Sequence, residues 1–309
     1  MQTPRASEQV LPDLAAEAPP SPGPLYLGAL PDHWHAVPDT VLDGADLQGL
    51  SIRGASLRGS RHRREGVVRQ DAMGIYPVSA NGIEAVLGVV ADGVDGEPLS
   101  HLGAEQTCLI VRDEVRARLS QLFSWQMLED GLIDESNDEI GQVCLDIVQS
   151  AADRLSGRAT FLHAKPKALS TSLAVVVVDI TPADKRLNRF VTFRVGDSSA
   201  FFGNGASNVD IQPIFRALEP RQGDHPTTSL PTSANRVSKR GGWLGGRSWV
   251  AVCTSGLDES LRRPDIESQV KSSWSNGRSI PTLPEFASQV AVEADGTDAD
   301  RTAICFWGR

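Results

Sequence analysis

Isolated aspartates stand beside apolar runs in three separate parts of the sequence. Asp71 precedes one such run, Asp92 ends the apolar residues 85–91, and Asp197 closely follows another at residues 190–195. Mg²⁺ and Mn²⁺ bind several oxygen ligands that converge from different strands, and a pair of such ions can activate water and neutralise developing negative charge. A carboxylate that ends so apolar a strand needs a compensating partner. We therefore interpret Asp92 as the leading metal-ligand candidate.

Basic side chains lie in and just after the segment GSRHRREG, shortly before the first of these aspartates. A flexible guanidinium binds phosphate through paired hydrogen bonds, so Arg61, Arg63, Arg64 and Arg69 are all candidate phosphate ligands. His62 is a candidate proton donor to a leaving oxygen. The alternatives are that this segment is a solvated basic turn and that His62 is structural or simply exposed.

Strand and helix patterns occur in blocks along the chain. Helical spacing of apolar residues predicts helices at residues 102–122, 140–155 and 284–292. Extended patterns predict strands at residues 51–57, 73–78, 83–90, 172–180, 190–195, 200–202, 249–254 and 302–307. Asn81-Gly82 between two of them is typical of a hairpin turn, and the Pro- and Gly-rich residues 219–247 are expected to be surface loop. This order indicates an α+β fold with helices packed on a largely antiparallel sheet.

Composition narrows the class of function. The chain has 309 residues, 40% of them hydrophobic and 22% charged, which is ordinary for a soluble globular protein. A net charge of −9 disfavours nucleic acid as a partner, because binding to its backbone needs clustered Lys and Arg. No apolar stretch approaches the roughly 20 residues that cross a bilayer, and no signal-peptide core is present, so we expect a cytoplasmic protein without membrane contact. Four separated cysteines among apolar residues predict buried thiols rather than zinc ligands.

The first 45 residues differ from the rest in composition. Residues 1–45 are rich in Pro and Ala and are expected to be disordered, because they bury too little apolar surface to offset chain entropy. Residues 46–309 are expected to form one domain. Nothing in the sequence specifies an oligomeric state.

Four short motifs follow one another in a characteristic order. They are Gln70-Asp71, Ala91-Asp92-Gly93, Ser170-Thr171-Ser172-Leu173 and Val195-Gly196-Asp197-Ser198. On these motifs the chain resembles the metal-dependent protein phosphatase 2C family, and its bacterial branch in particular, from about residue 53 to residue 307. The resemblance implies a β-sandwich of mainly antiparallel strands flanked by helices. It also implies a serine/threonine phosphatase that uses Mg²⁺ or Mn²⁺, two ions in an intact site, on phosphoprotein substrates in bacterial signalling.

The resemblance implies roles for individual residues. Asp92 would bridge two metal ions, the Gly93 carbonyl would add a ligand, and Asp71 beside Gln70 would hold metal-bound water. Asp197 would belong to the same site, although it could instead only form hydrogen bonds across strands. The candidate catalytic residues are Asp71, Asp92, His62 and Arg69.

Two metal-ligand positions depart from the family pattern. Ser255 and Ala299 stand where the family has aspartate. Two divalent ions bring four positive charges, whereas the two retained candidate metal ligands, Asp71 and Asp92, supply only two negative ones. Asp300 or Asp298 would have to fill the vacancy, and we take Asp300 as a candidate metal ligand. The arginine that many members carry four residues before the Gln-Asp pair is Gly66 here.

Two functions from different classes are therefore compatible with the sequence. The first is an active metal-dependent phosphatase, which the retained aspartates favour. The second is a pseudophosphatase, a phosphoprotein-binding or regulatory module, which Ser255 and Ala299 favour. An unrelated hydrolase has little support, because neither a nucleophile elbow nor a Ser/His/Asp ordering is present.

Overall fold

Two antiparallel sheets form the centre of the molecule in the computed structural model, which describes residues 37–124, 138–181, 187–204, 211–215, 229–275, 279–293 and 297–309. One sheet has the order β1-β2-β11-β10-β7-β8 and the other β3-β4-β5-β6-β9. The strands are β1 Thr40–Leu47, β2 Leu50–Leu57, β3 Ala72–Ala80, β4 Ile83–Gly93, β5 Thr171–Asp179, β6 Leu187–Val195, β7 Ser199–Asn204, β8 Gln212–Pro213, β9 Ser238–Gly245, β10 Ser248–Cys253 and β11 Arg301–Gly308.

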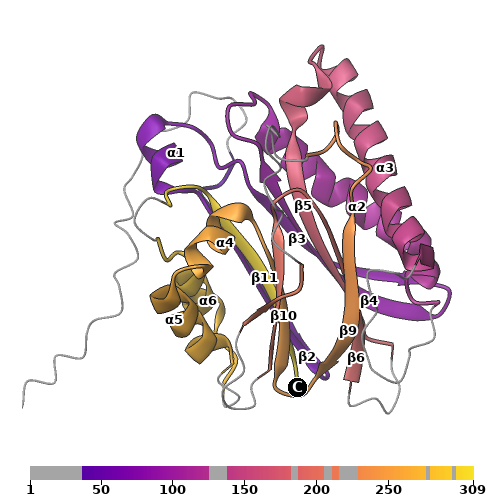
Figure 1. Cartoon of the computed structure of the whole chain (residues 1–309), viewed down its shortest axis with the longest axis vertical. Helices are drawn as coiled ribbons and strands as arrows, with labels where there is room; N and C mark the ends of the chain where they lie inside the picture. Colours follow the sequence, from indigo (N-terminus) through magenta and orange to yellow (C-terminus); the bar gives the residue numbers. More distant parts are fainter. Residues whose placement is uncertain are drawn as a thin grey trace, which may run out of the picture.

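Helices cover the outer face of each sheet (Figure 1). The two long helices, α2 Ser100–Leu122 and α3 Asp138–Phe161, pack on the sheet that contains β4 and β5. The other sheet carries α4 Ser255–Leu261, α5 Pro264–Trp274 and α6 Leu283–Val290. A short helix, α1 Ser60–Glu65, follows β2, and a 3₁₀ turn, Pro166–Leu169, precedes β5.

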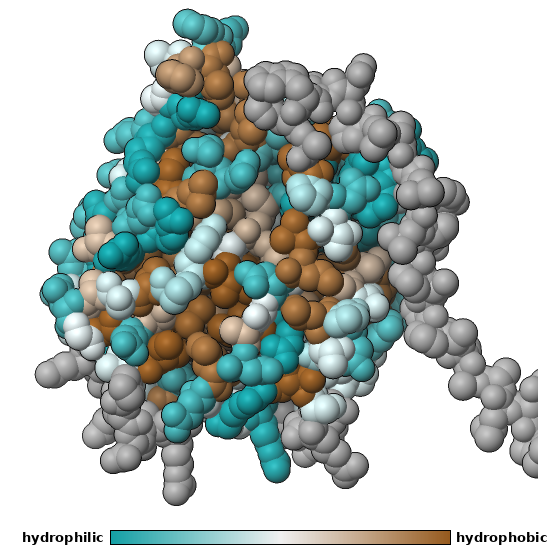
Figure 2. All heavy atoms as spheres, turned by 180° about the vertical axis from the view of Figure 1, so that it is seen from behind, coloured by the Kyte–Doolittle hydropathy of each residue, from teal (hydrophilic) through white to brown (hydrophobic). Residues whose placement is uncertain are grey.

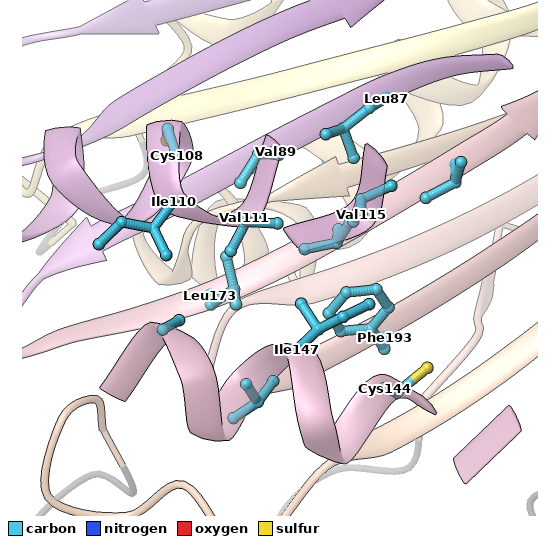
Figure 3. Close-up of a cluster of buried hydrophobic side chains, with 14 of the residues drawn as sticks. Leu87, Val89, Cys108, Ile110, Val111, Val115, Cys144, Ile147, Leu173 and Phe193 are labelled. Carbon is cyan, nitrogen blue, oxygen red and sulfur yellow. The ribbon is translucent and has the colours of Figure 1, made fainter. Parts of the chain in front are cut away.

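Apolar side chains fill three layers across this sandwich. Between the sheets, Val176 of β5, Val250 of β10 and Phe306 of β11 are fully buried. On one outer face, Val111 and other residues of α2 and α3 pack on β4, β5 and β6 (Figure 3). Because β5 is buried on both faces, its sequence reads as a continuous apolar run.

The second outer layer is aromatic. Trp274 of α5 packs edge-to-face against Trp249 and Trp307, with ring centroids 5.3 and 6.2 Å away. The ring centroids of Phe286 in α6 and Trp274 are 5.2 Å apart. Side chains of all three short helices belong to this one apolar layer on the sheet.

The surface of the molecule is mixed in polarity. Figure 2 shows the side opposite to that of Figure 1, where apolar side chains gather near the centre and hydrophilic ones surround them. Charged pairs such as Arg112–Asp113 lie on the exposed side of the long helices. Within the described residues, no helix combines the length and the apolar character that a membrane crossing requires.

The predicted α+β fold and its antiparallel sandwich are confirmed, and each strand and helix predicted from the sequence has a counterpart in the structure. Asn81 and Gly82 both have positive φ, as the predicted hairpin turn requires. The four cysteines are buried and free, as expected.

Three local predictions need correction. The basic turn after β2 is the helix α1, which ends at Gly66 in the left-handed conformation. The expected loop at residues 219–247 contains β9, whose Gly241 and Gly242 pair with β6. Within the segment expected to be disordered, residues 40–45 belong to β1, because this stretch completes an antiparallel hairpin with β2. Residues 1–36 lie outside the described residues.

Candidate functional site

One cavity of about 310 Å³ lies where several strands begin or end. β4 ends beside the start of β5, and β10 ends beside the start of β11, so antiparallel pairing brings residues from distant parts of the sequence to one edge. The cavity is lined by Arg61, His62, Gln70, Asp71, Asp92, Gly93, Val94, Asp95, Ser172, Asp197, Ser255, Ala299 and Asp300. The structure thus brings together most of the residues that the sequence singled out, but not Arg63, Arg64, Arg69 or Asp298.

Asp92 lies at the end of β4 and is bonded to Ser255. Its Oδ2 accepts hydrogen bonds from the Ser255 hydroxyl at 2.6 Å and from the Ser255 backbone N–H at 3.1 Å. Burial and the nearby charge of Asp197 raise the pKa of Asp92 to about 7, although the bonds from Ser255 oppose this shift. Ser255 is neutral, and it therefore donates two hydrogen bonds to Asp92 without adding a negative charge to the cavity.

Asp71 is held by two threonine hydroxyls. Its Oδ2 accepts hydrogen bonds from Thr254 Oγ1 and Thr302 Oγ1, both at 2.8 Å. Only 3% of the residue is exposed. Burial, followed by the charges of Asp92 and Asp300, raises the pKa of Asp71 well above its ordinary value. Burial and the neighbouring carboxyl groups thus favour the neutral form of Asp71.

Asp300 is buried and its carboxylate is engaged with the protein. Its Oδ1 accepts from the Gly59 N–H at 2.6 Å and contacts His62 Nδ1 at 2.9 Å, and its Oδ2 accepts from the Gln70 N–H at 2.6 Å. Burial alone would raise the pKa of Asp300, but the hydrogen bonds and charge of His62 and the two backbone donors lower it. Asp300 thereby fixes the start of α1 and the chain before β3.

The residues around Asp300 contribute little to a cation site. Ala299 lines the cavity but offers no ligand atom in its side chain. Asp298 does not line the cavity, and its carboxylate pairs with Arg64 Nη2 at 2.5 Å.

Asp197 and Gly93 occupy the remaining part of the acidic side. Asp197 lies in the turn between β6 and β7, where burial, and then the charge of Asp258, raise its pKa. The backbone at Gly93 packs closely, since a Cβ there would lie 2.8 Å from the Gln70 carbonyl oxygen and 3.0 Å from Ser100. This packing needs glycine at residue 93, and it holds the end of β4 against the first residue of α2.

The basic side of the cavity is formed by α1. Arg61 Nη2 donates to Asp95 Oδ2, and His62 Nε2 lies 3.3 Å from Asp95 Oδ1. Burial lowers the pKa of His62, but hydrogen bonds and charges from Asp300 and then Asp95 outweigh it, so the pKa is raised above 6.5. Both ring nitrogens of His62 therefore face a carboxylate, Nδ1 that of Asp300 and Nε2 that of Asp95.

Arg69 lies apart from this basic side. It is 4% exposed and does not line the cavity. Its guanidinium donates to the Pro38 carbonyl oxygen at 3.0 Å and to Ser56 Oγ. Of the four candidate arginines, only Arg61 lines the cavity.

Comparison with known proteins places this arrangement in a family. Residues 58–287 match the profile of protein phosphatase 2C. The chain belongs to the protein phosphatase 2C family. No curated protein matches the sequence.

Solved structures show the same phosphatase 2C fold. A serine/threonine phosphatase from S. agalactiae aligns with a TM-score of 0.53 and 15% identity, over 84% of this chain and 100% of that one. RsbX, solved in complex with magnesium, aligns with a TM-score of 0.51 and 13% identity, over 87% and 100%. PppA from Pseudomonas aeruginosa aligns with a TM-score of 0.50 and 13% identity, over 86% and 100%.

The donors of this phosphatase 2C cavity do not fit a two-metal centre as they stand. Ser255 and Ala299 supply no anionic ligand, and both carboxylate oxygens of Asp300 are bonded within the protein. Within the described part of the chain, no group of three His, Cys, Asp or Glu side chains is arranged to hold a metal ion.

Several site residues were not predicted from the sequence. Asp95, Thr254 and Thr302 contact site residues that were singled out. Arg61 was one of four candidate phosphate ligands, of which Arg69 was the one chosen as a candidate catalytic residue. A signal existed for the threonines, because Thr254 directly precedes Ser255 and Thr302 closely follows Ala299. Asp95 lies three residues after Asp92, but only the folded loop brings it to Arg61.

Proposed function

We propose that this phosphatase 2C protein recognises a phosphorylated serine or threonine of a partner protein and has lost two-metal hydrolysis. The observation that carries the proposal is the pair of hydrogen bonds from Ser255 to Asp92 Oδ2. In a working centre that oxygen would face a cation, which cannot donate a hydrogen bond and which needs the lone pairs that Ser255 occupies here.

The basic side of the cavity supports the binding half of the proposal. Arg61 and His62 face the same space, and an arginine and a histidine are suitable donors to phosphate oxygens. A protein in which these groups remain while metal ligands are replaced retains recognition without an activated water. It would act as a regulatory module that holds a phosphoprotein rather than dephosphorylating it.

A second candidate is a metal-dependent serine/threonine phosphatase that works with Mg²⁺ or Mn²⁺. Three carboxyl groups, those of Asp71, Asp92 and Asp197, line one cavity together with Gly93. Such a cluster would be relieved of mutual repulsion by a cation. This candidate requires Ser255 to turn away from Asp92.

Metal binding and turnover separate the two candidates. Mn²⁺ binding is measured by calorimetry and p-nitrophenyl phosphate turnover on the same samples, for the wild type, Asp92→Ala and the double variant Ser255→Asp/Ala299→Asp. We expect the wild type to show neither Mn²⁺ binding nor turnover up to roughly 10 mM Mn²⁺. Ordinary oxygen-ligand sites bind divalent cations with dissociation constants below this concentration. The double variant restores two anionic ligands and is expected to bind Mn²⁺.

The opposite result would identify the second candidate. Metal-dependent turnover by the wild type that is lost in Asp92→Ala would mean that the protein is an active phosphatase. If the double variant also fails to bind Mn²⁺ although it is folded, residues 255 and 299 are not the replaced ligand positions.

A further inference from the structure

The carboxylate of Asp95 lies against the basic side of the cavity. Its two carboxylate oxygens face two different donors: Oδ2 accepts from Arg61 Nη2 and Oδ1 lies 3.3 Å from His62 Nε2. Arg61 Nη2 and His62 Nε2 are themselves 3.4 Å apart. A pair of nitrogens at this separation, pointing at the two oxygens of one carboxylate, forms a small oxyanion site.

The three side chains differ in how firmly they are held. His62 is 5% exposed in its side chain and is fixed from behind by Asp300, which contacts Nδ1 at 2.9 Å. The side chain of Arg61 is 31% exposed, whereas that of Asp95 is 56% exposed. His62 is therefore held firmly by the protein, Arg61 is half-buried, and Asp95 is the most exposed of the three side chains.

The loop that carries Asp95 is anchored on both sides of it. The Val94 N–H donates to the Ser170 carbonyl oxygen at 2.9 Å, and the Glu97 N–H donates to the Val94 carbonyl oxygen at 3.2 Å. Rotation of the Asp95 side chain into solvent therefore does not require the loop to unfold. An ion pair with so exposed a partner contributes little to stability, so its loss is easily offset.

Arg61 also has unused hydrogen-bonding capacity. Its Nε is buried and has no hydrogen-bond partner among the described residues. A phosphate monoester has three terminal oxygens, one more than the two with which the Asp95 carboxylate bridges Arg61 and His62. It also carries more negative charge. It can therefore make the two contacts of Asp95 and still offer an acceptor to the guanidinium.

We propose that Arg61 and His62 form a metal-independent subsite for a phosphate monoester, and that Asp95 closes this subsite as an internal competitor. This inference rests on the proposed function, because it names the residues that recognise the phosphate. The incoming phosphate displaces the Asp95 carboxylate from Arg61 Nη2 and His62 Nε2, and no bond of the phosphate is broken. Free phosphate and the phosphoserine of a peptide share this chemistry.

The test measures binding of inorganic phosphate by calorimetry in the presence of EDTA, so that metal ions do not contribute. We expect Asp95→Asn to bind phosphate about tenfold more tightly than the wild type, because the competing carboxylate is removed. Arg61→Ala is expected to bind phosphate about tenfold more weakly, because one charge-assisted contact is lost. Arg61→Lys, which keeps the charge but not the forked donors, is expected to lie between Arg61→Ala and the wild type.

Asp298→Asn is the matched control. It removes the same charge near α1, where Asp298 pairs with Arg64 outside the cavity. This variant is expected to bind phosphate nearly as the wild type does. An equal gain in Asp95→Asn and Asp298→Asn would mean that only net charge matters, and it would overturn the proposal.

Two further outcomes would also overturn the proposed phosphate subsite. One is that Arg61→Ala binds phosphate with the affinity of the wild type, and the other is that Asp95→Asn shows no detectable phosphate binding. Urea unfolding of each variant excludes misfolding as the cause. A phosphoserine peptide and its unphosphorylated form, titrated in the same way, distinguish a protein-borne phosphate from free phosphate. The outcome is independent of the turnover experiment, because metal-dependent hydrolysis is absent in EDTA whichever candidate function holds.

Discussion

At the scale of single residues, two nearly adjacent acids have different tasks. The Asp300 carboxylate is buried and meets the Gly59 N–H, the Gln70 N–H and His62 Nδ1. Asp298 is partly exposed and makes one ion pair, with Arg64. Two acids separated by one residue look alike in the sequence, and only their surroundings in the folded protein distinguish them.

We expect Asp300→Ala to lower the free energy of unfolding by about 3–5 kcal/mol, because it leaves buried donors without an acceptor. Asp298→Ala should cost only about 0–1 kcal/mol, as is usual for an exposed ion pair. Urea unfolding of both variants beside the wild type measures the difference. Equal losses would contradict the structural role assigned to Asp300.

The acidic side of the site was predictable and its bonding was not. Asp71, Asp92 and Asp197 could be found because a carboxylate beside an apolar strand is unusual and has a fixed place at the edge of a sheet. Whether a carboxylate is free for a ligand depends on hydrogen bonds between residues far apart, such as that from residue 59 to Asp300. Such contacts leave no periodic trace in a sequence.

At the scale of elements, predictability followed the strength of the local pattern. β5 is a continuous apolar run and α3 has a regular apolar face, so both were found. β9 was missed, because SKRGGWLG lacks β-branched residues and carries a glycine pair, and its pairing with β6 stabilises it from outside. α1 has only six residues, too few for a clear period.

Asp179 stabilises the ends of β5 and β6. Its Oδ2 accepts from Arg189 Nη2 at 2.6 Å, and its Oδ1 accepts from the Thr181 hydroxyl at 2.6 Å and the Thr181 N–H at 2.9 Å. Burial would raise the pKa of Asp179, but these bonds outweigh it and lower the pKa. A lowered pKa in the folded state adds stability above the unfolded value of about 3.9, and this stability is lost as pH falls through the folded pKa.

We therefore expect Asp179→Asn to be less stable than the wild type at pH 7 by about 1–3 kcal/mol. The difference should narrow towards about pH 3, below the unfolded pKa, because the wild type then begins to lose the contribution of the ionised carboxylate. Urea midpoints at the two pH values test this, with Asp153→Asn on the exposed side of α3 as control. A difference that does not change with pH would mean that the charge of Asp179 is unimportant.

At the scale of the whole molecule, the contact between the two sheets decides the architecture. The sequence predicted antiparallel strands with helices outside, but not which side chains meet across the sandwich, because that depends on the relative position of two separately formed sheets. Gly88 of β4 and Phe306 of β11 meet there. A Cβ at residue 88 would lie 2.7 Å from Phe306 Cε2 and 3.2 Å from Val176 Cγ1.

The fully buried ring of Phe306 thus occupies the space that the missing side chain of Gly88 leaves. We expect Gly88→Ala to destabilise the protein by about 1–3 kcal/mol through overpacking. Phe306→Leu should cost a similar ~1–3 kcal/mol, because it leaves a small cavity at the tip of the former ring. In the double variant the new methyl group enters that cavity, so the combined loss should be smaller than the sum by about 0.5–3 kcal/mol. Urea unfolding of the four proteins closes this cycle. Strict additivity would show that the two sheets do not meet at Gly88 and Phe306.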